Sequence, residues 1–353
     1  GDGEDQDCDG TADEMTPVMV PALIAGNVGV VVQQPEIAWT GSEFGAVWHS
    51  RVGASSESSI GFARAGADGI LAEPAQKISP DSVGTEECRI SWTGTEFAVT
   101  YRGVVATETA ILLTRISADG DVVASNVIIS DPAVAAQRHF TIWTGSELGV
   151  FWDDLAGTSF ARVSPDGSIA LPRTQISTRR FPMPVWTGSE FHVFCDTFVN
   201  RVEPDGTPVG TEISLAGMEN VMDATWTGSE MGVVWWQPSP SDSQFFSRIS
   251  LLGERIGSDM VLRDMVTMDP GCQPILEPMG DIGEMASCLW PVAGSVGFWH
   301  LVPGMIEPAT EGSFASPSLG GGNMTPMAWT GSSMGIAWES AAGIYFGTIA
   351  DCG

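Results

Sequence analysis

The sequence predicts an all-β protein, a seven-bladed β-propeller with four-stranded antiparallel blades. A phrase that begins Trp-Thr-Gly-Ser-Glu, or a close variant, recurs along the 353 residues, at intervals of roughly forty to fifty residues. Within each copy, apolar and polar residues alternate with the period of two expected of a β-strand. The intact copies start at Trp39, Trp92, Trp143, Trp186, Trp226 and Trp329, and a damaged copy spans 284–290. Repeats of this length and pattern are typical of propeller blades that stack around a ring.

The second repeat shows how four strands fit into one blade. The first strand ends at Trp92, and the Thr-Gly-Thr that follows predicts a tight hairpin whose glycine takes a positive φ. The second strand begins at Glu96, and the third ends at the Asp-Gly pair at 119–120, which predicts another hairpin before the fourth strand. Residues one, three and five positions after the glutamate are mostly large and apolar in every intact copy. That face of the second strand is therefore predicted to be buried.

Two recurring positions predict how the blades are held together. Two residues after the glutamate the side chain is small in five repeats, which predicts a close approach of the neighbouring sheet. The glutamate also recurs with an arginine on the third strand in the first five repeats, and the last repeat lacks both, with Ser333 and Thr348 instead. The two are expected to pair within a blade or between adjacent blades, as scaffold rather than as an active site. The predicted pairs are Glu43 and Arg64, Glu96 and Arg115, Glu147 and Arg162, Glu190 and Arg201, and Glu230 and Arg248.

The last repeat lacks a fourth strand, whereas residues 15–25 precede the first repeat and have no blade of their own. The simplest prediction is that 15–25 form the outer strand of the last blade, so that both ends of the chain close the ring and no edge is left exposed. The predicted domain organisation is an acidic, metal-loop-like tail at 1–14 followed by a single propeller at 15–353.

This closure brings two cysteines together and predicts a disulfide. Cys8 precedes the added strand and Cys352 follows the last one, so a bond between them would fix the closure. In the damaged repeat, Cys272 and Cys288 are expected on the same rim and form the second predicted disulfide. The remaining cysteines, Cys88 and Cys195, fall in blades that are not adjacent, and their state is left open. The even count of six cysteines is compatible with an oxidising compartment, so the protein is expected to be secreted or exposed at the cell surface.

The net charge of −29 excludes several classes of partner. Such a surface repels DNA and anionic membranes, so we expect no nucleic-acid partner. No apolar run reaches the length of a membrane span, and no membrane insertion is expected. The charge suits solubility first and cation binding second.

The N-terminal stretch carries carboxylates in the alternating spacing of a calcium loop. Asp5, Asp7, Asp9 and Asp13 surround Gly10, and alternating carboxylates let one cation collect several oxygens from a tight turn. The stretch resembles the Asp-rich calcium loops of thrombospondin type 3 and dockerin repeats and the metal-binding repeats of secreted bacterial proteins. The resemblance implies Ca²⁺ as cofactor, although Thr16 stands where an EF-hand loop has a bidentate glutamate. The alternative is an acidic, unstructured tail.

The residues just beyond each second strand differ between repeats and mark a candidate ligand site. Loops at the mouth of a propeller can vary without disturbing the sheets, and ligands commonly bind there. The candidate ligand-binding residues are His49, Arg102, Asp153, Asp154, Asp196, Trp236 and Glu339.

No motif in the sequence indicates a particular catalytic chemistry. The four histidines lie in no spaced metal-ligand motif, and there is no nucleophile elbow, phosphate loop or dinucleotide fingerprint. The sequence therefore favours a binding module for an extracellular glycan or protein. The alternatives are a structural subunit of an extracellular assembly, and a hydrolase or lyase that uses carboxylates such as Asp153 and Asp196 at the mouth. The repeats themselves resemble the propeller repeats of secreted bacterial proteins, which implies the fold but no single function.

Overall fold

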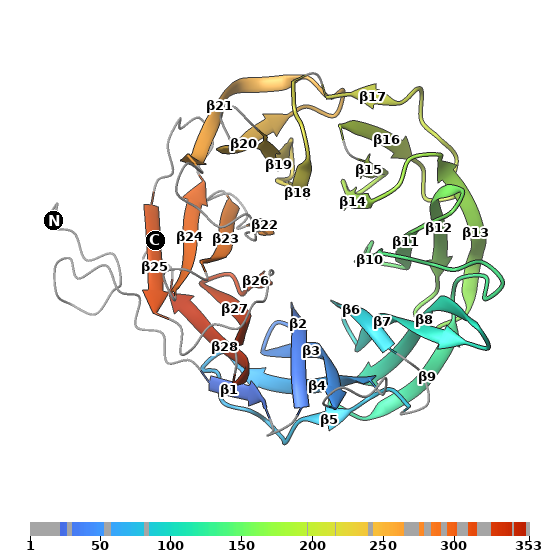
Figure 1. Ribbon diagram of the computed structural model, residues 1–353, viewed down its shortest axis with the longest axis vertical. Helices are drawn as coiled ribbons and strands as arrows, with labels where there is room; N and C mark the ends of the chain where they lie inside the picture. Colours follow the sequence, from blue (N-terminus) through green and yellow to red (C-terminus); the bar gives the residue numbers. More distant parts are fainter. Residues whose placement is uncertain are drawn as a thin grey trace, which may run out of the picture.

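The strands of the protein form a ring of antiparallel sheets (Figure 1). The computed structural model describes residues 22–26, 30–52, 58–80, 85–195, 197–215, 217–238, 243–264, 275–278, 284–290, 295–301, 310–315, 326–340 and 342–350. Within these residues, 28 strands form seven four-stranded antiparallel sheets, one for each repeat. Side chains are described in all of these sheets except the one formed by β22–β25, where the description is of the backbone. The protein is thus an all-β propeller with four-stranded antiparallel blades.

Each blade consists of strands a, b, c and d, with strand a nearest the centre of the ring (Figure 1). Blade 1 consists of β2 (Val30–Trp39), β3 (Glu43–Val52), β4 (Ser58–Gly66) and β5 (Gln76–Lys77). Blade 2 consists of β6 (Thr85–Trp92), β7 (Glu96–Val105), β8 (Glu108–Ser117) and β9 (Val122–Ile128). Blade 3 consists of β10 (His139–Trp143), β11 (Leu148–Asp154), β12 (Gly157–Val163) and β13 (Ile169–Ser177). Blades 4 and 5 are β14 (Pro182–Trp186), β15 (Phe191–Cys195), β16 (Phe198–Val202) and β17 (Ile213–Ser214); and β18 (Val221–Trp226), β19 (Met231–Gln237), β20 (Ser243–Ile249) and β21 (Arg255–Asp264). Blades 6 and 7 are β22 (Ile275–Pro278), β23 (Glu284–Trp290), β24 (Ser295–Leu301) and β25 (Thr310–Ala315); and β26 (Met327–Trp329), β27 (Ser333–Ser340), β28 (Gly343–Ala350) and β1 (Ala22–Ala25).

Both ends of the chain contribute to blade 7. Strand β1 pairs antiparallel with β28, with Ala22 opposite Phe346 and Leu23 opposite Tyr345, and it is the outer strand of this sheet (Figure 1). The prediction that a strand before the first repeat completes the last blade is confirmed. The strand begins at Ala22, and residues 15–21 of the predicted segment lie outside the described part of the chain.

The repeated phrase forms the hairpin between strands a and b. In blade 3, the Thr144 hydroxyl accepts a hydrogen bond from the Glu147 amide at 3.1 Å and donates one to the Glu147 carbonyl oxygen at 2.9 Å. Gly145 between them has φ +93°, a left-handed conformation that suits glycine. The equivalent threonine makes the same two bonds in blades 1, 2, 4, 5 and 7. The phrase is therefore a structural element, which forms the same turn in blades 1 to 5 and 7.

The glutamate and arginine of the repeat pair within one blade, which confirms the five predicted pairs. The nitrogen–oxygen distances are 2.9 Å for Arg64–Glu43, 2.8 Å for Arg115–Glu96, 2.9 Å for Arg162–Glu147, 2.8 Å for Arg201–Glu190 and 2.5 Å for Arg248–Glu230. Three of these arginines also reach the next blade. They donate to a carbonyl oxygen in its c–d turn, Arg64 to Ala118 at 2.9 Å, Arg115 to Asp166 at 2.7 Å and Arg162 to Pro204 at 3.0 Å. One guanidinium thus joins its own blade to its neighbour by charge-assisted hydrogen bonds.

Replacing Arg115 by threonine is expected to lower the free energy of unfolding by about 2 kcal/mol, because it leaves the half-buried Glu96 carboxylate without its partner. Urea denaturation measures the loss. The double variant Glu96→Ser with Arg115→Thr copies the residues of blade 7 and is expected to lose less than Arg115→Thr alone. A double variant that loses as much as the single one would contradict the pairing argument.

Adjacent blades fit together where a small residue on one strand b faces a large one on the next. A Cβ atom built on Gly45 would lie 2.4 Å from Cε1 of Phe97 in blade 2. The same construction on Gly149 and Gly335 comes within 2.8 Å of Phe191 and 2.4 Å of Phe44. These contacts confirm that the small position marks the close approach of the neighbouring sheet. Blade 2 has Ala98 at this position, and the facing residue of blade 3 is the smaller Leu148, buried in the same cluster.

Several predicted features fall on residues that the structure does not describe. They are the acidic segment 1–14 with Asp5, Asp7, Asp9 and Asp13, together with Cys8, Cys272 and Cys352, while Cys288 is described only as part of the backbone of β23. The calcium loop and the two disulfides therefore stay predictions. In the described part of the chain, no helix has the length and apolar character that a membrane span requires.

Candidate functional site

Six of the seven predicted ligand-binding residues lie on one rim of the ring, where strand b of their blades ends. We call it the mouth rim; it also carries the described connections from strand d of one blade to strand a of the next, whereas the Thr-Gly-Ser turns lie on the opposite rim. His49, Arg102, Trp236 and Glu339 lie near the ends of β3, β7, β19 and β27, and Asp153 and Asp154 end β11. Asp196 lies outside the described residues.

The two aspartates of blade 3 are neutralised by arginines. Nε and Nη2 of Arg180, in the connection between blades 3 and 4, donate to Oδ2 of Asp153 at 3.0 and 2.7 Å. Nη2 of Arg173 donates to Oδ2 of Asp154 at 2.7 Å. Both aspartates are fully buried beneath these contacts. The carboxylates therefore serve to position arginine side chains on the mouth rim.

Asp154 is not suited to donate a proton. Its burial alone would raise the pKa, but hydrogen bonds from Arg173, from the Ala156 amide and from Ser159 outweigh burial and hold the pKa below its ordinary value. A glycosidase needs one carboxyl group whose pKa is raised, so that it can act as the acid. Asp154 stays ionised, so it does not meet that requirement.

The other predicted residues are also engaged with local partners. Arg102 forms an ion pair with Glu86 of the neighbouring strand. Glu339 accepts a hydrogen bond from the Gln34 amide at 3.4 Å, across the contact between blades 7 and 1, and its burial raises its pKa. Burial lowers the pKa of His49, so its imidazole is neutral at pH 7. Trp236 is half-buried, and its amide donates to the Asn220 carbonyl oxygen at 3.1 Å.

A second set of mouth residues, which the sequence reasoning missed, lies within strand a in blades 1 and 2 and directly before it in blades 3 and 4. Gln34, Glu87, Arg138 and Phe181 each stand five residues before the repeat tryptophan of blades 1 to 4, and we call them the lead residues. Gln34, Glu87 and Phe181 have left-handed backbones, with φ of +52°, +39° and +61°. Near Gln34 and Glu87 the strand register shifts, as in a β-bulge. Such conformations cost a residue other than glycine about 1–3 kcal/mol, and they concentrate at functional sites.

Phe181 is the most unusual of the lead residues. The residue is 52% exposed, so burial does not offset the cost of its backbone conformation. It also precedes Pro182, whose ring favours an extended conformation in the residue before it. An exposed phenylalanine held in this way points to a role outside the core of the protein.

Two guanidinium groups lie over the Phe181 ring. The Cζ atom of Arg138 is 5.0 Å and that of Arg180 is 5.5 Å from the ring centroid, within the range of cation–π contacts. Arg180 is tied to Asp153 and also donates to Oε1 of Gln137 at 3.2 Å. Arg138 is exposed and has no ion-pair partner among the described residues. The lead residues Arg138 and Phe181, together with Arg180, form a patch that we call the Phe181 cluster.

Behind the lead residues, three side chains are arranged like a nucleophile with its base. Nε2 of His139 lies 3.1 Å from the Thr100 hydroxyl, and its Nδ1 lies 4.0 Å from Oε2 of Glu87. Both Thr100 and His139 are completely buried. Burial, with the positive charges of Arg89 and Arg102, lowers the pKa of His139 to about 3. A hydroxyl that no substrate can reach is not a nucleophile, so this arrangement is structural.

Cys88 and Cys195 are free thiols in the interior and are not bonded to each other. Burial raises the pKa of both, that of Cys195 to about 11. Neither forms a thiolate at neutral pH, so neither is suited to nucleophilic or redox chemistry. Within the described residues, no group of three or more histidine, cysteine, aspartate or glutamate side chains could hold a metal ion.

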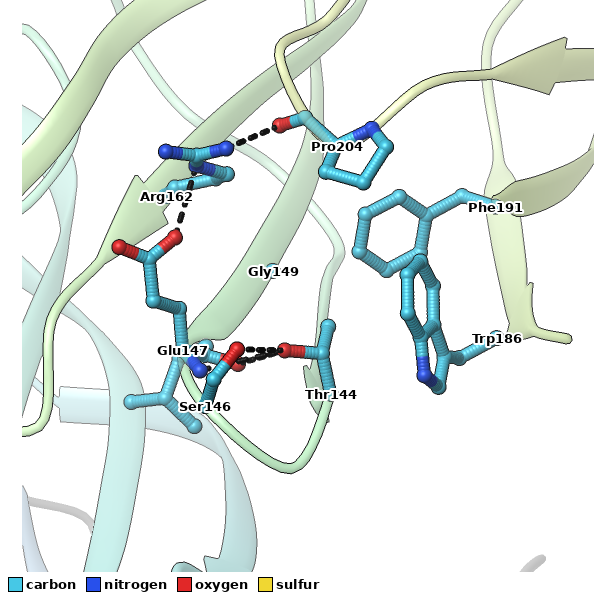
Figure 2. Close-up of a pocket in the computed structure, with 9 residues that line it drawn as sticks. Thr144, Ser146, Glu147, Gly149, Arg162, Trp186, Phe191 and Pro204 are labelled. Carbon is cyan, nitrogen blue, oxygen red and sulfur yellow. Dashed lines mark hydrogen bonds and ion pairs between the residues drawn. The ribbon is translucent and has the colours of Figure 1, made fainter. Parts of the chain in front are cut away.

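A small pocket of about 120 Å³ lies on the opposite rim, between blades 3 and 4. Figure 2 shows Arg162 between Glu147 and Pro204 on one side, and Trp186 packed beside Phe191 on the other. These are the hairpin, ion-pair and packing residues of the repeat, and the equivalent contacts recur in other blades. The pocket therefore belongs to the scaffold, and the mouth rim remains the candidate site.

Comparisons with known proteins show the fold alone. No family model matches the chain, and no curated protein matches it. Among solved structures, it is similar to a streptogramin B lyase, with 12% identity and a TM-score of 0.55 over 96% of this chain and 100% of that one. The β-propeller domain of the trilobed protease from Pyrococcus furiosus has 9% identity and a TM-score of 0.55 over 91% of this chain and 93% of that one. The α-L-arabinanase of Penicillium chrysogenum, complexed with arabinobiose, has 9% identity and a TM-score of 0.51 over 95% of this chain and 99% of that one.

These comparisons correct the family resemblance drawn from the sequence. The repeats resemble those of secreted bacterial proteins, and the N-terminal tail resembles thrombospondin type 3 and dockerin loops, but no family model supports either assignment. A short phrase such as Trp-Thr-Gly-Ser-Glu is fixed by the needs of a hairpin and an ion pair, so it identifies a kind of blade rather than a family.

Proposed function

We propose that the protein is a binding module, secreted or exposed at the cell surface, which holds a glycan or protein ligand on the mouth rim at the Phe181 cluster. The observation that supports this most directly is Phe181 itself, an exposed aromatic side chain with a left-handed backbone, beneath two guanidinium groups. Aromatic and arginine side chains contribute most of the binding energy at many interfaces. The protein retains the strained backbone of Phe181 although the exposed side chain does not pack into the core.

The fold alone does not distinguish a binding function from a catalytic one, since the similar solved structures include a lyase and an arabinanase. The local chemistry favours binding. Asp153 and Asp154 are both paired with arginines, and the buried thiols and the Thr100 hydroxyl are inaccessible. The arabinobiose complex of the arabinanase makes saccharides a reasonable first set of ligands to test.

Replacing Phe181 by alanine is expected to abolish ligand binding, or to weaken it at least tenfold, without unfolding the protein, because the ring is half exposed. Purified wild type and variant are compared on glycan and peptide arrays. Leu252→Ala is the matched control, since Leu252 is 64% exposed in the c–d turn of blade 5, on the opposite rim. Binding that Phe181→Ala leaves unchanged, or that Leu252→Ala reduces equally, would contradict the proposal.

Phe181→Gly should lose binding while gaining up to about 1 kcal/mol of stability, because glycine relieves the strained backbone.

A further inference from the structure

We propose that the ligand of the Phe181 cluster is an acidic saccharide, whose uronate carboxylate is bound by Arg138 while its sugar ring packs on Phe181. This inference rests on the proposed function, because it names the chemical class of the ligand for the same site. It is carried by the donors that the cluster presents, by the charge balance around Arg138 and by the position of the aromatic ring.

The polar groups of the cluster are donors. Arg138 and Arg180 have only N–H groups to offer, and the Gln137 side chain already uses its oxygen to accept from Arg180 at 3.2 Å. The exposed amide of Gln137 therefore contributes its N–H groups as well. A site made of donors selects a ligand rich in acceptors, and a carboxylate matches the planar fork of a guanidinium.

The charge around Arg138 favours an anion from outside the protein. The chain has 44 acidic and 15 basic residues, so carboxylates are abundant. On the same rim, Arg180, Arg102 and Arg89 have carboxylate partners in Asp153, Glu86 and Glu36. Arg138 has no such partner among the described residues, and its one contact with a ring is to Phe181 at 5.0 Å. An exposed guanidinium that lies over an exposed aromatic residue and has no counterion among the described residues is a position at which an anionic ligand gains affinity.

The neighbouring ring favours a sugar acid over an acidic peptide. A pyranuronate carries a carboxylate and an apolar C–H face on one rigid unit, so both Arg138 and Phe181 are engaged with little loss of conformational entropy. An aspartate or glutamate in a peptide has its carboxylate on a flexible side chain with no apolar face beside it. The ring of Phe181, a residue that is 52% exposed, would then stay uncovered.

The test is titration calorimetry of the full chain with hexagalacturonate at physiological salt, which screens the long-range repulsion between the ligand and the net charge of −29. Three comparison ligands are used: a neutral galactose hexamer, poly-L-glutamate and inorganic sulfate. We expect the wild type to bind hexagalacturonate, the Arg138→Gln variant to bind it roughly ten- to a hundredfold more weakly, and Arg138→Lys to fall between them because lysine keeps the charge without the fork. Arg51→Gln removes an exposed guanidinium from the same rim in blade 1 that, unlike Arg138, lies over no aromatic ring of the described residues, and it is expected to change the affinity less than twofold.

The outcomes separate this inference from the proposed function. Failure to bind hexagalacturonate, equal binding of the neutral hexamer, equal binding of poly-L-glutamate or of sulfate, or an unchanged affinity in Arg138→Gln would each overturn the acidic saccharide. If the arrays show a ligand that depends on Phe181 but not on Arg138, the binding module stands and its ligand is of another class. If no ligand depends on Phe181, both proposals fall.

Discussion

The variant Gly45→Ala is expected to lose about 2–3 kcal/mol of unfolding free energy, although it adds a single methyl group. The new Cβ would lie 2.4 Å from Cε1 of Phe97, and that ring is completely buried between blades 1 and 2. Gly45 has an ordinary extended backbone in β3, so the loss comes from the contact and not from φ. Because interiors are close-packed, the ring has no free space into which it could move. Urea denaturation of the two proteins measures the difference.

The neighbouring contact supplies the compensating change. Blade 2 presents Ala98 to Leu148 of blade 3, in the positions where blade 1 presents Gly45 to Phe97. Adding Phe97→Leu to Gly45→Ala is therefore expected to recover more than half of the lost stability, with a coupling of about 1–3 kcal/mol between the two sites.

The mirror experiment uses blades 2 and 3. Leu148→Phe alone should be destabilising, and Ala98→Gly should rescue it, because the pair then reproduces the fit of Gly45 with Phe97. Strictly additive losses in both pairs would show that the small position does not set the spacing of the blades.

These contacts also show why so much of the fold could be predicted. The period of the repeats, the alternation in strand b and the Glu–Arg pairing are local patterns that every blade has to satisfy, so the sequence states them several times. Closure by β1 could be predicted because one blade lacks a strand and one segment lacks a blade. The reach of Arg64 to Ala118 in the next blade was not predicted, since nothing in the sequence of one blade specifies a backbone carbonyl of another.

The site was harder to predict, because a site consists of departures from the repeat. Sequence variation after strand b drew attention to residues such as Asp153 and Arg102, which turn out to be paired locally. Phe181 and Arg138 share one offset from the repeat tryptophan and differ in every blade, which is the signal that could have identified them. Their significance depends on exposure, on a positive φ and on a contact between adjacent blades, and none of these can be read from a single position.

The buried His139 is expected to make the protein sensitive to acid. Burial lowers the pKa of the folded imidazole to about 3, whereas an unfolded histidine titrates near 6.5. The unfolded chain therefore binds a proton that the folded one does not, so this contribution to stability is fully present above pH 6.5 and is lost as the pH falls toward 3. Each unit of difference corresponds to about 1.4 kcal/mol, which places the loss on the order of a few kcal/mol at pH 4.

The comparison of wild type with His139→Gln isolates this histidine from the many carboxylates that titrate in the same range. At pH 7 the variant should be less stable by about 1–2 kcal/mol, because it disturbs the hydrogen bond to Thr100. Toward pH 4 the difference should shrink and then reverse, since glutamine cannot be protonated. Thr100→Val is the control: it removes the same hydrogen bond but keeps the titrating ring, so its deficit should persist at low pH. If the difference in unfolding free energy between wild type and His139→Gln stayed constant from pH 7 to pH 4, burial would not be holding the imidazole neutral.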